Sequence, residues 1–182
     1  HEPLAKWFAG EEAMQQAEKK DFVKQYARNQ VTAVVLRHMI IDELMCEAIG
    51  RTHGPRQVVI LGAGFESRSY RFKHLPVRWF EIDLPEPAIE KERILKERGV
   101  KDDPKIIKRL KLDLVTDDWV TALKEAGWDP TAPTFYILEG LIYYMTTEGA
   151  IALLTSIPHV PGSRIALSII ESSLQRVFES YG

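Results

Sequence analysis

A short glycine-containing segment, Gly62-Ala63-Gly64-Phe65-Glu66-Ser67, follows a run of β-branched and aliphatic residues. Two glycines separated by one residue let a chain turn tightly and let a ligand lie against bare backbone. A complete dinucleotide-binding fingerprint would have a third glycine at position 67, where this chain has Ser67. The segment therefore predicts either a ligand-binding turn around Gly62 and Gly64 or an ordinary tight turn from a strand into a helix.

An acidic residue stands at a distance from this turn that suits the ribose of a nucleotide. Asp83 lies 21 residues beyond Gly62, at the end of a second apolar run. A carboxylate in that place can accept hydrogen bonds from both ribose hydroxyls. Because the glycine turn precedes it at the appropriate spacing, we favour this interpretation over a solvated carboxylate at a strand end.

Two more acidic residues follow later apolar runs. Asp113 could accept a hydrogen bond from an adenine amino group while Leu114 lies against the ring, although Asp is also common as a helix N-cap. Glu139 ends a central apolar run, and a carboxylate is seldom buried there without a partner. Tyr143 and Tyr144 follow closely and are candidates to line a substrate pocket or, alternatively, to pack in the core.

Arg37 is the candidate cation of the site. It shares one face of a predicted helix with Ile40, Ile41 and Leu44. Its guanidinium could grip a ligand carboxylate, or it could be a surface arginine that lies along apolar neighbours. The sequence shows no Ser-His-Asp or Cys-His arrangement, so we assign no catalytic residue. We expect His38 to be structural or exposed.

The elements that must position these residues alternate along the chain. We expect strands at residues 57–62, 78–83, 106–114, 134–139 and 164–170. We expect helices at residues 31–49, 86–98, 118–126 and 147–157. Such alternation predicts an α/β fold with a parallel sheet and right-handed crossovers. Ligands of such sheets bind at the carboxyl ends of the strands, where all the candidate residues after strands lie.

Length and composition are those of one globular domain, with 182 residues, of which 45% are apolar, and a net charge of −2. We expect a helical segment over residues 1–50 and the sheet over residues 57–182. The near-neutral charge favours neither a nucleic acid nor a membrane as partner. The single cysteine, Cys46, excludes a thiolate-rich metal site and suits a cytoplasmic location. We expect no metal, no signal peptide and no membrane span.

Five stretches occur together in a familiar order, at Pro3–Gly10, Gln57–Arg71, Phe80–Glu86, Leu112–Leu114 and Glu139–Tyr144. In these stretches the chain resembles the leucine carboxyl methyltransferase family, in particular its bacterial branch of small-molecule O-methyltransferases. The resemblance implies a class I methyltransferase fold, which is a Rossmann-like parallel sheet with helices on both faces. It also implies a strand order of 3-2-1-4-5-7-6, of which the last two strands would be absent from this chain.

The resemblance further implies that S-adenosyl-L-methionine is the cofactor. By analogy its ligands would be Arg37, Gly62, Asp83, Asp113 with Leu114, and Glu139. One departure is Glu66, where members of the family usually carry Asp. We expect transfer of a methyl group to a carboxylate or hydroxyl of a small molecule or of a protein C-terminus. A carboxylate acceptor is ionised at neutral pH and needs no general base.

Two other functions fit parts of the pattern. A nicotinamide-dependent oxidoreductase also uses a glycine turn and an acid about 20 residues later, but Ser67 and the motifs at Asp113 and Glu139 disfavour it. A truncated, non-catalytic cofactor-binding module is the second alternative. The fifth strand, residues 164–170, is apolar apart from Arg164. An open edge of that kind can pair with another chain, so we expect an inner strand or a homo-oligomer.

Overall fold

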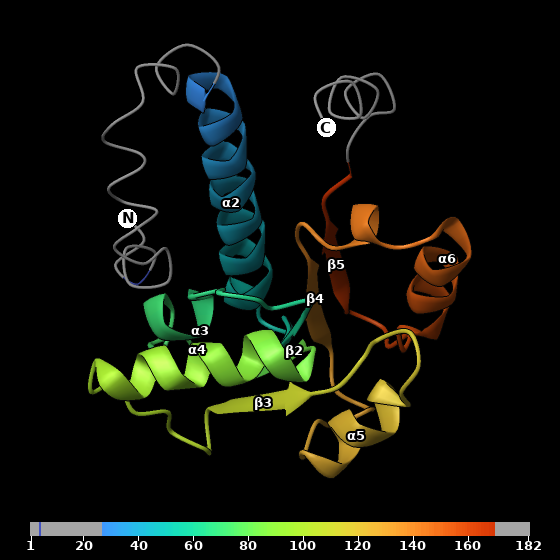
Figure 1. Cartoon of the computed structure of the whole chain (residues 1–182). Coiled ribbons are helices and arrows are strands. Elements are labelled where there is room, and N and C mark those ends of the chain that lie inside the picture. The colour runs from blue at the N-terminus through green and yellow to red at the C-terminus, as the bar shows by residue number, and fades with distance from the viewer. Residues whose placement is uncertain (1–3, 5–26, 170–182) are drawn as a thin grey trace.

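A computed structural model describes residue 4 and residues 27–169 of the chain (Figure 1). The elements before the middle of the sheet are α2 (Ala27–Gly50), β1 (Gln57–Leu61), α3 (Arg68–Arg71), β2 (Arg78–Asp83), α4 (Pro85–Glu97) and β3 (Ile107–Lys111). They are followed by α5 (Trp119–Glu125), β4 (Thr134–Leu138), the 3₁₀ turn η2 (Ile142–Tyr144), α6 (Thr147–Ser156) and β5 (Arg164–Leu167).

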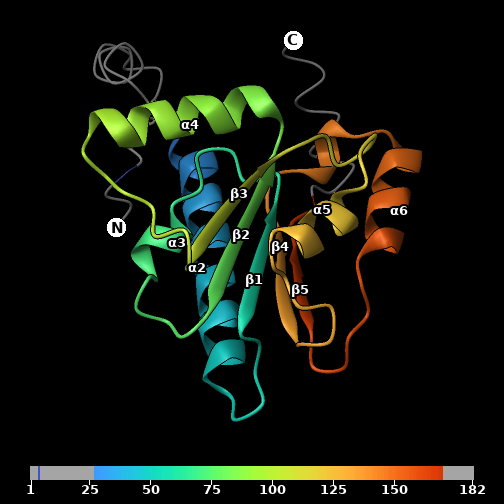
Figure 2. The same cartoon turned by 90° about the horizontal axis from the view of Figure 1, so that it is seen from below.

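The five strands form one parallel sheet in the order β3-β2-β1-β4-β5. This is the order that the family resemblance implies for the first five strands. Strands β1, β2 and β3 follow one another in one direction across the sheet, and β4 and β5 follow in the other. The topological switch point, where ligands of such sheets bind, therefore lies between β1 and β4. Helices α2, α3 and α4 lie on one face and α5 and α6 on the other, which confirms the predicted α/β fold (Figure 2).

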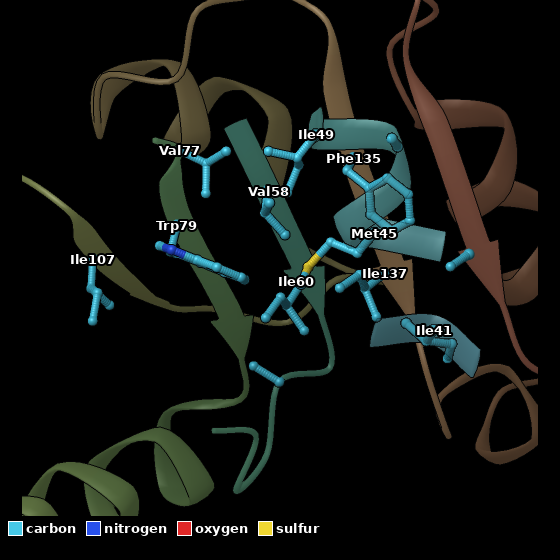
Figure 3. Close-up of a cluster of buried hydrophobic side chains, with 13 residues drawn as sticks. Ile41, Met45, Ile49, Val58, Ile60, Val77, Trp79, Ile107, Phe135 and Ile137 are labelled. Atoms are coloured by element: carbon cyan, nitrogen blue, oxygen red, sulfur yellow. The ribbon is translucent and has the colours of Figure 1, made fainter. Parts of the chain in front are cut away.

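One face of the sheet packs against the second half of α2. Ile41, Met45 and Ile49 of this helix contact alternate residues of the strands, among them Val58 and Ile137 (Figure 3). Alternation follows from the pleat, because successive side chains of a strand point to opposite faces. The first half of α2 extends past the sheet (Figure 1), and its apolar residues there, such as Val35, are exposed.

The opposite face packs against α5 and α6. The remaining strand residues, including Val59, Phe80 and Leu138, form a second core with Trp119 and Leu153 from these helices. Since both faces are covered, the central strands β1 and β4 are buried along their whole length. That explains why they appear in the sequence as continuous apolar runs.

The structure shortens several predicted elements. Strand β3 ends at Lys111 and not at residue 114, because the backbone turns at Asp113 after Leu112 has donated its last sheet-type hydrogen bond to the Asp83 carbonyl at 2.9 Å. Strand β5 ends at Leu167, and the predicted last residue, Ile170, lies outside the described residues. The two short helices α3 and η2 were not predicted.

Helix α2 begins before the predicted residue 31. The rest of the predicted N-terminal helical segment, including the stretch Pro3–Gly10 apart from Leu4, lies outside the described residues. Within the part of the chain that the structure covers, none of the helices combines the length and the apolar character that a bilayer span requires.

Strand β5 lies at an edge of the sheet in the described part of the chain. Ala166 faces α2 and is buried, whereas Ile165 and Leu167 face the other side and are 51% and 37% exposed. Nothing in residues 27–169 covers these two side chains to the degree seen for β1 and β4. The prediction that β5 is an inner strand of a larger assembly therefore stays a prediction.

Candidate functional site

The glycine turn leaves β1 at the carboxyl edge of the sheet. The N–H groups of Gly62 and Ala63 both donate to the Ile82 carbonyl, at 2.9 and 3.0 Å, so the chain leaves the strand there. Gly62 has a φ of +70°, and a Cβ at this position would lie 2.7 Å from the Leu141 side chain. Glycine is therefore required both by the backbone conformation and by the close approach of the segment after β4.

Asp83 stands beside this turn, as the spacing predicted. One carboxylate oxygen accepts the Gly64 N–H and the other accepts the Leu84 N–H at 2.7 Å. The side chain is half-buried, and each oxygen keeps a further lone pair that can accept another hydrogen bond. The structure thus brings Gly62, Gly64 and Asp83 together, with the carboxylate fixed at the mouth of the turn.

Asp113 and Leu114 form the turn that follows β3. The Asp113 carboxylate accepts the Val115 N–H at 2.8 Å, and its own N–H donates to Asp117 at 2.8 Å. Asp113 is not the N-cap of α5, because that cap is Asp118, which accepts the Thr121 N–H at 3.0 Å. Leu114 is half-buried against the α5 and α6 side of the core.

Arg37 and Glu139, which the sequence offered as separate ligand contacts, are bound to each other. Arg37 Nε donates to Glu139 Oε1 at 2.7 Å, and Arg37 Nη1 donates to the Tyr143 hydroxyl at 2.9 Å. The Glu139 side chain is only 8% exposed and that of Arg37 is 32% exposed. Tyr144 stacks in a tilted arrangement on Tyr143, with 5.3 Å between ring centroids, and is otherwise exposed.

A buried arginine that the sequence reasoning did not single out completes this cluster. Arg68 has no exposed surface and lies close to three carboxylates, those of Asp42 at 2.5 Å, Glu139 at 2.7 Å and Glu66. Burial alone would lower the pKa of Arg68, but the charges of Glu66, Glu139 and Asp42 raise it above its ordinary value. Arg71, at the end of the same short helix, also binds Asp42, at 2.6 Å.

The same surroundings decide the charge of Glu139. Burial alone would raise the pKa of Glu139, but the hydrogen bond with His38 and the guanidinium groups of Arg68 and Arg37 lower it to about 2. Glu139 is therefore an ionised carboxylate at neutral pH, held by two arginines that come from different helices.

His38, which the sequence led us to expect as structural or exposed, is a partly buried member of this cluster. Its Nδ1 lies 3.2 Å from Glu139 Oε2 and its Nε2 lies 2.8 Å from Arg71 Nη2. Arg68 Nη2 also lies 2.9 Å from Nδ1. Each ring nitrogen of His38 therefore faces an arginine, and Nδ1 faces the Glu139 carboxylate as well.

Ligand atoms of His38, Glu66 and Glu139 all lie within 4.8 Å of one another, a spacing that could hold a metal ion. The Arg68 guanidinium already binds both of these carboxylates. The guanidinium supplies the positive charge that a metal ion would otherwise supply to these carboxylates, so we interpret the group as an ion-pair network.

A second buried network lies beneath Asp83. Glu81 is fully buried on β2 and binds Lys91 of α4 at 2.8 Å and Arg109 of β3 at 3.0 Å. Burial alone would raise the pKa of Glu81, but the charges of Lys91 and Arg109 outweigh this effect, so the pKa lies below its ordinary value. These contacts join α4 and β3 to β2.

A local pattern in the sequence could have indicated part of the ion-pair cluster around Arg68. Glu66, Arg68 and Arg71 place one acid and two bases within six positions directly after the glycine turn. Such a charged segment leaving a buried strand predicts ion pairs, although the partners Asp42 and Glu139 lie far away along the chain. Ser168 gave no signal; its hydroxyl accepts the Gly140 N–H at 2.8 Å and holds the segment after β4.

Comparison with solved structures supports the fold. The mitomycin 7-O-methyltransferase MmcR superposes with a TM-score of 0.50 at 15% sequence identity, covering 90% of this chain and 46% of that protein. A likeness at this level of identity concerns the fold alone. The α/β Rossmann-like arrangement of the class I methyltransferases is thereby shown for this chain.

Sequence comparison gives closer relatives. Proteins from Mycolicibacterium gilvum and Mycobacteroides abscessus, both named "Putative S-adenosyl-L-methionine-dependent methyltransferase", are each 37% identical, over 149 and 139 residues. These matches cover 77% and 75% of this chain but only 47% and 45% of the relatives, so the chain spans about half of their length. The model of one family, leucine carboxyl methyltransferase, matches residues 1–158. The chain therefore belongs to the leucine carboxyl methyltransferase family.

Proposed function

We propose that this chain binds S-adenosyl-L-methionine and forms the cofactor-binding part of an O-methyltransferase. The observation that carries the proposal is the arrangement around the glycine turn. The Asp83 carboxylate accepts the Gly64 N–H of this turn, and Leu141 packs on Gly62 two residues after Glu139, which binds Arg37 of α2. The cofactor has a ribose at its centre and a zwitterionic amino acid at one end, and these charges match that arrangement.

The residues fit the cofactor one by one. Gly62 and Gly64 have positive φ angles of 70° and 42°, so the turn after β1 carries no side chains at these two positions. Asp83 would accept the ribose hydroxyls, and Asp113 with Leu114 would receive the adenine. Arg37 would hold the carboxylate of the amino-acid end, and Glu139 would face its ammonium group. Each assignment agrees with what the family resemblance implies for these positions.

The cofactor supplies a methyl group that its sulfonium already activates for transfer. The task left to the protein is to hold an acceptor oxygen in line with the sulfur–methyl bond, which is an effect of orientation. We propose a carboxylate or hydroxyl acceptor on a small molecule or a protein C-terminus. A carboxylate is ionised at neutral pH and needs no base. Tyr143 and Tyr144, which follow Glu139, would line the acceptor side.

The binding half of the proposal is tested by calorimetry with S-adenosylhomocysteine and NAD on the same preparation. We expect binding of S-adenosylhomocysteine and none of NAD, and the reverse result would favour the oxidoreductase alternative. The catalytic half is tested by a methyl-transfer assay on the full-length gene product beside this chain. Cofactor binding without transfer by either protein would favour the non-catalytic module.

A further inference from the structure

Arg68 connects the elements that build the candidate site. It begins α3, and its side chain reaches Asp42 on α2, Glu66 in the glycine turn and Glu139 at the end of β4. Its Nη2 also donates to the His38 carbonyl at 3.1 Å. Because the side chain has no exposed surface, a ligand cannot touch it without a rearrangement of the chain. Any effect of Arg68 on ligand binding must therefore pass through its neighbours.

The two oxygens of the Glu139 carboxylate have different partners. Oε2 lies 2.7 Å from Arg68 Nη2 and 3.2 Å from His38 Nδ1, on the buried side. Oε1 accepts from Arg37 Nε at 2.7 Å, on the more exposed side. The terminal torsion of a glutamate has only weak intrinsic preferences, so contacts of this kind decide its orientation. Arg68 holds one oxygen and thereby presents the other to Arg37.

We infer that Arg68 is a positioning residue, which holds Glu139 and through it Arg37 in the orientation that recognises the amino-acid end of the cofactor. The inference rests on the proposed binding of S-adenosyl-L-methionine. It goes beyond that proposal, because it assigns a binding role to a residue that touches no part of the ligand.

Electrostatics supports this role. Without the Arg68 guanidinium, the carboxylates of Asp42, Glu66 and Glu139 would lose the buried cation that they share. Arg71 would still bind Asp42, and Arg37 would still bind Glu139 Oε1. Removing one partner of a buried ion pair leaves an uncompensated charge, which the chain relieves by moving a side chain or by taking up a proton. Either response reaches Glu139, because its Oε2 would lose the contact with Arg68 and keep the contact with His38.

The test compares two ligands that differ only at the amino-acid end. S-adenosylhomocysteine has this end, and 5′-methylthioadenosine lacks it but keeps the adenosine. We expect Arg68→Met to weaken binding of S-adenosylhomocysteine roughly 10- to 100-fold, since a charge-assisted hydrogen bond is lost indirectly. Binding of 5′-methylthioadenosine should stay within about twofold. Arg68→Lys, which keeps the charge but not the fork, should give an intermediate loss for S-adenosylhomocysteine alone.

Lys91→Met is the matched control, because Lys91 is also a buried cation, paired with Glu81 away from the Glu139 cluster. We expect this variant to lower the melting temperature while each folded molecule binds both ligands normally. A double variant, Arg68→Met with Glu139→Gln, should bind S-adenosylhomocysteine no more weakly than Glu139→Gln alone. Equal losses for both ligands, or additive losses in the double variant, would overturn the inference. If the unmodified chain binds neither ligand, the proposed function itself has failed.

Discussion

Arg37 on α2 and Glu139 after β4 form an ion pair, with 2.7 Å between Nε and Oε1, although 102 residues separate them in the sequence. The pair joins α2 to the segment that follows a central strand, beside the glycine turn. A ligand that carries both an ammonium and a carboxylate group offers a partner to each half of this pair. We therefore expect the candidate site to prefer zwitterionic ligands.

Asp83→Ala should weaken binding of S-adenosylhomocysteine by about 2–3 kcal/mol while the fold persists, since hydrogen bonds to a charged group contribute about 1.5–3 kcal/mol each. Asp83→Asn should weaken binding less than Asp83→Ala, because one acceptor oxygen remains for a backbone N–H. Calorimetry and thermal melting measure the two effects separately. Asp129→Ala is the control, because Asp129 also accepts a backbone N–H, from Thr131 at 2.8 Å, in the loop before β4. A mutant at position 83 that melts far lower but binds normally per folded molecule would show that Asp83 is structural.

Gly62→Ala and Gly99→Ala form a matched pair, because both glycines have a φ of +70°. The backbone strain of alanine there should destabilise each variant by about 1–2 kcal/mol, as seen in urea unfolding. A Cβ at position 62 also meets Leu141, whereas one at position 99 meets nothing within 4 Å. We therefore expect only Gly62→Ala to weaken binding of S-adenosylhomocysteine. Equal binding by the two variants would contradict a ligand contact at the turn.

The ion pairs of Glu139 should make folding stability depend on pH in a defined window. The pKa of Glu139 is about 2 in the folded chain and 4.5 for an unperturbed glutamate. A lowered folded pKa means that the stabilisation is complete above about pH 4.5 and is lost as the pH falls towards 2. In urea unfolding, the free energy of unfolding of the wild type should exceed that of Glu139→Gln, and this difference should shrink as the pH falls through this window.

The exposed Glu125 provides the control for that measurement. The difference between the wild type and Glu125→Gln should change little over the same pH range. An advantage over Glu139→Gln that stays constant down to pH 3 would show that the carboxylate is not held by its arginines in solution.

The edge of β5 should mediate self-association of this chain. Ile165 is 51% exposed on a strand with no pairing partner on its outer side among the described residues. An apolar, unpaired edge is a template for another strand. We expect sedimentation velocity to show association that grows with concentration and that Ile165→Lys reduces. Ile89→Lys on α4, where Ile89 is 54% exposed, should leave it unchanged. A monomer at every concentration would contradict the prediction.

The features that the sequence determined by itself are local ones. The buried strands β1 and β4 are continuous apolar runs, and the turn after β1 has its two glycines at close spacing, so both could be recognised within a few residues. Asp83 was found by its distance from the turn, because one crossover separates adjacent parallel strands. The order of the strands followed from the family resemblance.

The acidic residues on β2 show what the sequence left open. Glu81 and Asp83 are two positions apart and point to the same face of the sheet. Register places Glu81 opposite Arg109 in the interior, where it also meets Lys91. Asp83 lies at the strand end, where its carboxylate reaches the glycine turn. The number of residues between them carries no information about which one would be buried.

Only the tertiary structure decided the partners of the charged residues at the site. Arg68 lies 26 residues from Asp42, and Glu139 lies 101 residues from His38, so no periodicity or spacing could pair them. The pairing arises because α2, the glycine turn and the end of β4 all converge on the carboxyl edge of one parallel sheet. Burial there demands that each charge find an opposite one, and the fold determines which partners lie within reach.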